Sequence, residues 1–102
     1  MITIKNLRTE KPQMPYDVKV DRSSVLGNPF PLQNETQRDI VCDKYEKWLR
    51  ERIANKDKNI CDELNRLYRI AKQYNKLNLF CWCFPKRCHA ETIRLILLEK
   101  LQ

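Results

Sequence analysis

The feature that most constrains this chain is a nearly continuous apolar run from Leu77 to Trp82, close to its C-terminal end. The run has the length of a strand and hardly alternates with polar residues, which is typical of a strand covered on both faces. A cysteine-rich turn follows, and after it apolar residues recur at helical spacing from His89 or Ala90 to Leu101. We therefore expect a buried strand that leads through a short turn into a C-terminal helix.

Four further segments precede this strand. Ile2 to Asn6 and Tyr16 to Asp21 alternate apolar with polar residues and are predicted to be short strands. Helical spacing predicts one helix from Thr36, its N-cap, to about Asn55, and a second from Ile60 to Tyr74. The order is β-β-α-α-β-α. It predicts one α/β domain over residues 1–102, with helices packed on a small three-stranded sheet that is at least partly parallel.

Size, charge and cysteine content limit what the chain can be. With 102 residues it is long enough for one core, and no apolar run approaches the ~18 residues that span a bilayer. The N-terminus has none of the parts of a signal peptide, so a cytoplasmic protein without membrane contact is predicted. Five cysteines in a reducing compartment are expected to be thiols or metal ligands. The net charge of +7 favours anionic partners.

A second irregular segment, Arg22 to Pro31, follows the second predicted strand. Two prolines flank Phe30, and Gly27, the only glycine of the chain, is expected to supply a positive φ. The segment is therefore predicted to be a stiff loop. In a parallel sheet this loop and the turn from Cys83 to Cys88 both follow the carboxyl end of a strand. They are thus predicted to share the sheet edge at which ligands bind.

The two strand-end segments carry the groups of an anion site. The first amides of the C-terminal helix are free and its dipole attracts negative charge, while Lys86 and Arg87 add positive charge. The earlier loop contributes donors suited to phosphate or ribose: Arg22, Ser23, Ser24 and Asn28. The leading hypothesis is that a nucleotide or another phosphorylated small molecule binds here. The simpler alternative is that Ser23, Ser24 and Asn28 only satisfy the hydrogen bonds of a turn.

A metal site is the second hypothesis, and its ligands would be Cys81, Cys83, Cys88 and His89. Three thiols and an imidazole are ligands that Zn²⁺ prefers, and bound zinc would shape a surface that interacts with a host protein. The C-x-C-x4-C-H spacing is not a common zinc-finger spacing, however, and adjacent residues rarely ligate one ion comfortably. Cys81 is also explained as a small buried hydrophobe.

Cys88 and His89 are also candidate catalytic residues. A helix N-terminus and the cationic neighbours Lys86 and Arg87 should lower the pKa of the Cys88 thiol. A cysteine beside a histidine is the minimal pair of nucleophile and base, but the sequence identifies no third residue to orient them. An enzyme is therefore the third hypothesis.

Sequence-specific nucleic-acid binding is not expected. The aromatic residues of the two middle helices are predicted to face the core rather than to stack on bases. They are Tyr45, Trp48, Tyr68 and Tyr74. Basic residues on these helices are interleaved with acidic ones, which is typical of a solvated face, and no nucleic-acid-binding motif is present.

Two motifs, Gly27-Asn28-Pro29-Phe30 and Cys81-Trp82-Cys83-x-Pro85-x-x-Cys88-His89, resemble those of a family of domains of unknown function found in bacteria and their phages. That family is marked by GNPF followed by CxCxPxxCH, and the resemblance spans nearly the whole chain. It implies a cytosolic, phage-type protein with one compact site, which in that setting would sequester or process a host signal nucleotide. The implied site residues are Arg22, Gly27, Asn28, Pro29, Cys81, Cys83, Pro85, Cys88 and His89.

Overall fold

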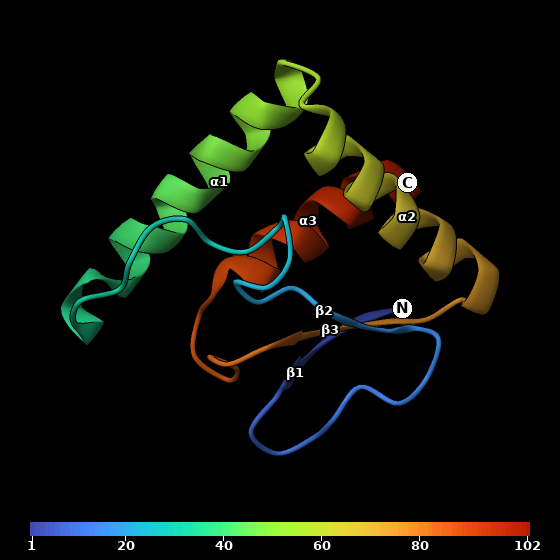
Figure 1. Cartoon of the computed structure of the whole chain (residues 1–102), viewed down its shortest axis with the longest axis horizontal. Coiled ribbons are helices and arrows are strands. Elements are labelled where there is room, and N and C mark those ends of the chain that lie inside the picture. Colours follow the sequence, from blue (N-terminus) through green and yellow to red (C-terminus); the bar gives the residue numbers. More distant parts are fainter.

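A sheet of three parallel strands, with three α-helices on one side of it, makes up the computed structural model of residues 1–102 (Figure 1). The elements are β1 (Ile2–Asn6), β2 (Asp17–Lys19), the short 3-10 helix η1 (Glu35–Gln37), α1 (Arg38–Ala54), α2 (Lys58–Tyr74), β3 (Leu77–Cys81) and α3 (His89–Leu101). This confirms the predicted α/β class, the order β-β-α-α-β-α and the parallel strands. None of the helices combines the length and the apolar character that crossing a bilayer requires.

β3 is the central strand, with β1 and β2 on its two sides. All five of its residues are buried, and Leu79 pairs with Ile4 on one side and Val18 on the other. A strand in this position has neighbouring strands along both edges and other chain segments over both faces, which is why its sequence can be apolar almost throughout. Trp82, predicted as the last strand residue, lies beyond the strand and is 52% exposed.

The two faces of the sheet are covered by different parts of the chain. α3 packs on β1 and β3, α2 packs on β3, and α1 lies against the other two helices. The connection from β1 to β2, residues 7–16, lies on the other side of the strands from the helices (Figure 1). The two connections between strands run in opposite directions across the sheet, so right-handed crossovers place them on opposite faces. This accounts for the burial of Phe80, which points away from the core side chain of Leu79.

The core lies between the sheet and the helices and contains one cluster of 18 buried residues. Tyr45 of α1 is fully buried in it, while Trp48 and Tyr68 pack against the cluster from its edge. The prediction that Tyr74 faces the core is wrong. Tyr74 is the last residue of α2, and its exposed ring packs against that of Tyr16, with centroids 5.9 Å apart.

Two element ends differ from the sequence predictions. β2 is shorter, because only Asp17–Lys19 pair with β3, although the buried Val20 still donates its amide to Phe80 O at 3.0 Å. Thr36 is not the N-cap of α1. It lies inside η1, and its hydroxyl donates to the Asn34 side chain. A residue within a 3-10 turn lacks the extended backbone that an N-cap needs.

Candidate functional site

A cavity of about 280 Å³ lies at the carboxyl ends of β2 and β3. Its walls come from the segment after β2, the N-terminal part of α1, the turn after β3 and the start of α3. The residues predicted for the site that line this cavity are Arg22, Ser23, Asn28, Cys83, Cys88 and His89. The remaining predicted residues lie outside the lining; they are Ser24, Gly27, Pro29, Cys81, Pro85, Lys86 and Arg87.

The first wall is the segment of residues 21–31, here called the GNPF loop, and hydrogen bonds among its own residues hold it. The Asp21 carboxylate accepts from the Ser23 amide at 3.1 Å and also from the Ser23 hydroxyl. Asn28 Oδ1 accepts from the Phe30 amide at 2.8 Å. The simpler alternative, that these side chains satisfy turn hydrogen bonds, thus describes part of their role. The side-chain amide nitrogen of Asn28, Nδ2, remains available to donate a hydrogen bond.

Gly27 is needed for a different reason from the one predicted. Its φ is not positive, so the expected left-handed conformation is wrong. A Cβ atom at this position would lie 2.6 Å from Asp21 O and 2.7 Å from Arg22 Cα, both of them backbone atoms. The loop closes on itself here, and the Gly27 amide donates to Ser24 O at 2.9 Å. Glycine is therefore the residue that allows this close approach of two backbone segments.

Tyr45 of α1 holds the GNPF loop against the core. Its hydroxyl donates to Leu26 O at 2.6 Å, and its ring packs edge-on against His89 with centroids 5.1 Å apart. Burial raises the pKa of Tyr45, so the hydroxyl keeps its proton and stays a donor. Helical spacing predicts that Tyr45 faces the core, but nothing in the sequence shows which carbonyl its hydroxyl reaches.

The second wall is the segment of residues 82–88, here called the cysteine turn, and groups from distant parts of the sequence hold it. Asn6, at the end of β1, donates its side-chain amide to Phe84 O, and the Trp82 indole donates to the Asp21 carboxylate at 3.1 Å. Partial burial raises the pKa of Asp21, but the hydrogen bonds that it accepts outweigh this effect and lower the pKa. Asp21 is therefore charged at neutral pH and orients the Trp82 ring at the rim of the cavity.

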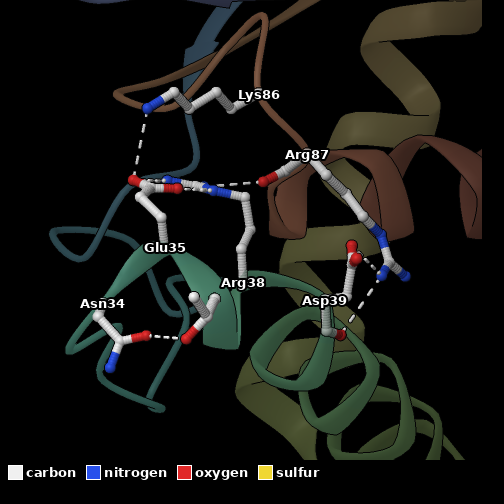
Figure 2. A network of polar contacts seen from close by, with 7 residues as sticks. Asn34, Glu35, Arg38, Asp39, Lys86 and Arg87 are labelled. Carbon is white, nitrogen blue, oxygen red and sulfur yellow. Dashed lines mark hydrogen bonds and ion pairs between the residues drawn. The ribbon is translucent and has the colours of Figure 1, made fainter.

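Lys86 and Arg87 do not line the cavity, because acidic residues of η1 and α1 bind both of them (Figure 2). Lys86 Nζ lies 3.4 Å from Glu35 Oε1. Arg87 forms ion pairs with Asp39 at 3.1 Å and with Asp43 at 2.8 Å. These two cations therefore attach the cysteine turn to α1 and its preceding turn instead of presenting their charge at the strand ends.

Two other guanidinium groups lie beside the cavity, and they differ in their partners. Arg38 donates to Glu35 through two hydrogen bonds of 2.8 and 2.9 Å, and to the carbonyl oxygen of Arg87 at 2.9 Å (Figure 2). Arg22 is exposed, and its one hydrogen bond, to Phe30 O, is long at 3.5 Å. The charge of Arg22 is therefore the one at this cavity that can meet an anion.

Two buried thiols, those of Cys81 and Cys88, meet where the cysteine turn enters α3. Cys81 Sγ and Cys88 Sγ are 3.2 Å apart, and Cys83 lies near enough to influence the pKa of Cys88. These contacts, together with burial, raise the pKa of Cys88, so the prediction that the helix lowers it is wrong. The hydrogen bond from Cys88 and then the adjacent Arg38 guanidinium outweigh partial burial and lower the pKa of Cys83 to about 5.

Cys83 and Cys81 both have lowered pKa values, but their surroundings differ. Contact with Cys88 also lowers the pKa of Cys81, to about 6. Cys81 is fully buried, however, and the guanidinium of Arg38 lies beside Cys83. Neighbouring thiols do not ionise independently, so a thiolate at Cys83 keeps the proton on its neighbours.

His89 does not join the thiols. Its Nε2–H donates to Val20 O, and burial lowers its pKa, so the ring is neutral with Nδ1 left as an acceptor. The structure has no group of three or more histidine, cysteine, aspartate or glutamate side chains placed to hold a metal ion. The predicted zinc set is thus not assembled, because the imidazole that would complete it is bound to the end of β2.

Sequence reasoning missed four side chains that shape the site: Asn6, Asp21, Arg38 and Trp82. Asn6, Asp21 and Trp82 each end or follow a predicted strand, and the parallel topology alone indicates that such residues meet at one sheet edge. Arg38 stands at the start of a charged helix, and no sequence pattern separates it from the other surface arginines.

Fold and site together define a small parallel α/β protein with a ligand-sized cavity at its strand ends. A family model described as Domain of unknown function (DUF4326) matches residues 4–99, and the chain belongs to this family. The predicted membership of a family of domains of unknown function is thereby confirmed. Searches among curated proteins and among solved structures found no match.

Proposed function

We propose that this protein binds a nucleotide-like or otherwise phosphorylated small molecule in the strand-end cavity. One observation supports this above the others: the cavity combines an aromatic ring of set orientation, Trp82, with an unpaired guanidinium, that of Arg22. An aromatic side chain is a stacking surface for a base, and a free guanidinium binds two phosphate oxygens at once.

The size of the cavity determines how much of such a ligand can enter. About 280 Å³ is near the lower end of small-molecule pockets, which typically hold ~300–1,000 Å³. A base and part of its sugar suit this space, with the phosphates at the rim beside Arg22. In the wall, Asn28 offers an amide donor and His89 an acceptor nitrogen, which complement the hydrogen-bonding edge of a base.

Binding, rather than conversion of the ligand, is what these groups favour. The carboxylate of Asp21 accepts hydrogen bonds from Ser23 and Trp82, and the His89 ring donates to Val20 O. The Asp21 carboxylate is thus occupied by its partners, and His89 offers a ligand only the acceptor Nδ1. In the phage setting that the family resemblance implied, the ligand would be a host signal nucleotide, sequestered in the cytosol of the host.

The tryptophan at the rim can report binding directly. The chain has two tryptophans, and Trp48→Phe leaves Trp82 as the only one. We would titrate a panel of nucleotides and sugar phosphates to millimolar concentration into this variant. The ligand that fits should quench Trp82 fluorescence in a saturable way. Calorimetry on the unchanged chain should return the same affinity.

Arg22→Gln should weaken this binding about tenfold or more, because a hydrogen bond to a charged group contributes about 1.5–3 kcal/mol. Lys19→Gln is the matched control, since it removes one positive charge from an exposed residue outside the cavity lining. Equal losses of affinity in the two variants would refute the proposal. So would the absence of saturable quenching by every ligand of the panel.

A further inference from the structure

Two buried thiols, those of Cys81 and Cys88, lie with their sulfur atoms in contact, and the nucleotide site proposed above does not use this contact. All five cysteines of the chain are free thiols, and Cys81 Sγ and Cys88 Sγ are 3.2 Å apart. The sulfur atoms of a disulfide lie about 2.05 Å apart, so this pair needs to close by only about 1 Å. The two side chains are therefore close to a geometry in which a bond can form.

Regular secondary structure fixes the backbone at both cysteines. Cys81 is the last residue of β3, and its carbonyl accepts the Leu7 amide at 2.8 Å. Cys88 is the N-cap of α3, and its carbonyl accepts the Glu91 amide at 3.1 Å. Both side chains also belong to the buried core cluster. The contact between the sulfur atoms is therefore a product of the fold, although six residues of the turn separate the two cysteines.

The pair can be reached through the strand-end cavity. Cys88 is 4% exposed and lines this cavity, whereas Cys81 is 1% exposed and lies outside the lining. A molecule in the cavity thus meets Cys88 first. The volume of about 280 Å³ admits a small oxidant such as a hydroperoxide, but not the disulfide of a folded protein.

We propose that Cys81 and Cys88 form a site of reversible oxidation, at which a small hydroperoxide that enters the cavity converts the two thiols to a Cys81–Cys88 disulfide. The Cys88 sulfur attacks the terminal peroxide oxygen, the O–O bond breaks, and the thiol proton passes to the released oxygen, which leaves as an alcohol or as water. Cys88 is then a sulfenic acid. The Cys81 sulfur attacks the Cys88 sulfur, the S–O bond breaks, and the hydroxyl leaves as water with the Cys81 proton. Two thiols are oxidised and one hydroperoxide is reduced.

The first of these steps is the slow one. Contact with Cys81, together with burial, raises the pKa of Cys88, so little of this thiol is present as the reactive thiolate. The pair therefore responds to a sustained excess of peroxide rather than to a trace. The reaction requires no nucleotide, so it stands or falls separately from the ligand proposed above.

The disulfide would join the end of β3 to the start of α3 and close the cysteine turn into a ring. Trp82, which lines the cavity, lies within this ring. A cross-link restricts the unfolded chain, so oxidation should raise the melting temperature, by about 10 °C for a short ring in a chain of this size. Reduction with dithiothreitol should return the original melting temperature. The pair thus acts as an oxidant-sensitive lock on the cysteine turn.

The positions of basic residues make the disulfide easy to detect. Lys86 and Arg87 lie between the two cysteines, so trypsin separates them and a disulfide joins the peptides of residues 77–86 and 88–94. We would treat the reduced full chain with excess hydrogen peroxide at neutral pH, stop samples with acid, alkylate the remaining thiols and quantify the joined peptide by mass spectrometry. Fragmentation between Cys81 and Cys83 identifies which of them is bonded to Cys88.

The same chain in concentrated urea is the control for the role of the fold. In the folded chain, the joined peptide should carry Cys81 at least about tenfold more often than Cys83, because the sulfur atoms of Cys81 and Cys88 are already in contact. In urea this preference should disappear, since the shorter loop between Cys83 and Cys88 is then at least as easy to close.

Three variants test the individual steps. Cys83→Ser should form the joined peptide as fast as the unchanged chain. Cys81→Ser should stop the reaction at a sulfenic acid on Cys88, which dimedone captures in the peptide of residues 88–94. Cys61→Ser, in α2 and outside the cavity lining, is the matched control and should react like the unchanged chain.

Three outcomes would overturn the proposal. Excess peroxide could yield no joined peptide from the folded chain, or a peptide bonded mainly through Cys83. The oxidised chain could also melt no higher than the reduced one. All three are read from the unchanged chain, so they decide the matter even if a variant fails to fold.

Discussion

The GNPF loop and the cysteine turn line the same cavity, yet most of their hydrogen bonds differ in range. In the GNPF loop, hydrogen bonds join residues two or three positions apart, such as Asn28 with Phe30 at 2.8 Å. In the cysteine turn, the partner of Phe84 O is Asn6, which lies 78 positions earlier in the chain. A substitution in the first segment should therefore act on the loop itself. One in the second should act through partners on β1 and α1.

The largest effect is expected from Gly27→Ala, which breaks the self-contained loop. The added Cβ would lie 2.6 Å from Asp21 O, so the backbone must shift. Overpacking of this kind costs about 1–3 kcal/mol, and contact with backbone atoms points to the upper end. Urea denaturation measures the change in the free energy of unfolding. Val25→Ala, at an exposed neighbour, is the control and should stay within about 0.5 kcal/mol of the unchanged chain. A Gly27→Ala variant equal to this control would contradict the packing described.

Tyr45→Phe should have the next largest effect, because it removes the hydrogen bond by which α1 holds the GNPF loop. Leu26 O would lose its 2.6 Å hydrogen bond while remaining buried, at a cost of about 1–2 kcal/mol in the free energy of unfolding. Tyr68→Phe removes a hydroxyl from a partly buried tyrosine of α2 and serves as the control. Equal losses of unfolding free energy in the two variants would show that the hydrogen bond from Tyr45 to Leu26 O does not stabilise the fold.

Arg38→Gln should change the chemistry of the cysteine turn more than its stability. The pKa of Cys83 is lowered to about 5, so its alkylation by iodoacetamide should rise with pH through about 5 and then level off. Loss of the Arg38 cation should raise this pKa. At pH 6 the first unit of increase lowers the thiolate fraction about twofold and a second unit lowers it a further ~5-fold, each unit of pKa corresponding to about 1.4 kcal/mol. Mass spectrometry of the tryptic peptide 77–86 measures the labelling rate. Arg87→Gln removes a cation paired with Asp39 and Asp43 and should leave the profile in place.

Lys86→Ala should have the smallest effect, although it lies in the cysteine turn. Its ion pair with Glu35 joins two exposed side chains, and such pairs contribute about 0–1 kcal/mol, less at high salt. Urea denaturation should therefore show little change, and the affinity for any phosphorylated ligand should be kept. A large loss of affinity would instead assign the anion-binding charge to Lys86 rather than Arg22.

Much of the fold could be predicted because periodicity is a property of neighbouring residues. The apolar run from Leu77 onwards, the alternation in Ile2–Asn6 and the helical spacing in α2 each depend on a few adjacent positions. The failures share a different cause. Thr36 was predicted to be an N-cap, but it lies inside η1. Gly27 was predicted to have a left-handed conformation, but it is needed because two backbone segments approach each other closely there. Tyr74 has core-like spacing, yet its ring is exposed and packs against that of Tyr16.

The sequence by itself determined the elements, their order and the edge of the sheet at which the unusual residues gather, since parallel strands bring their carboxyl ends together. Only the tertiary structure decided which of those residues carry free charge. Lys86 and Arg87 are paired by η1 and α1, Arg22 is not, and the pKa is lowered at Cys83 but raised at Cys88. Charge pairing and thiol ionisation depend on groups a few ångströms away in space, and in this turn those groups come from segments far apart in the chain.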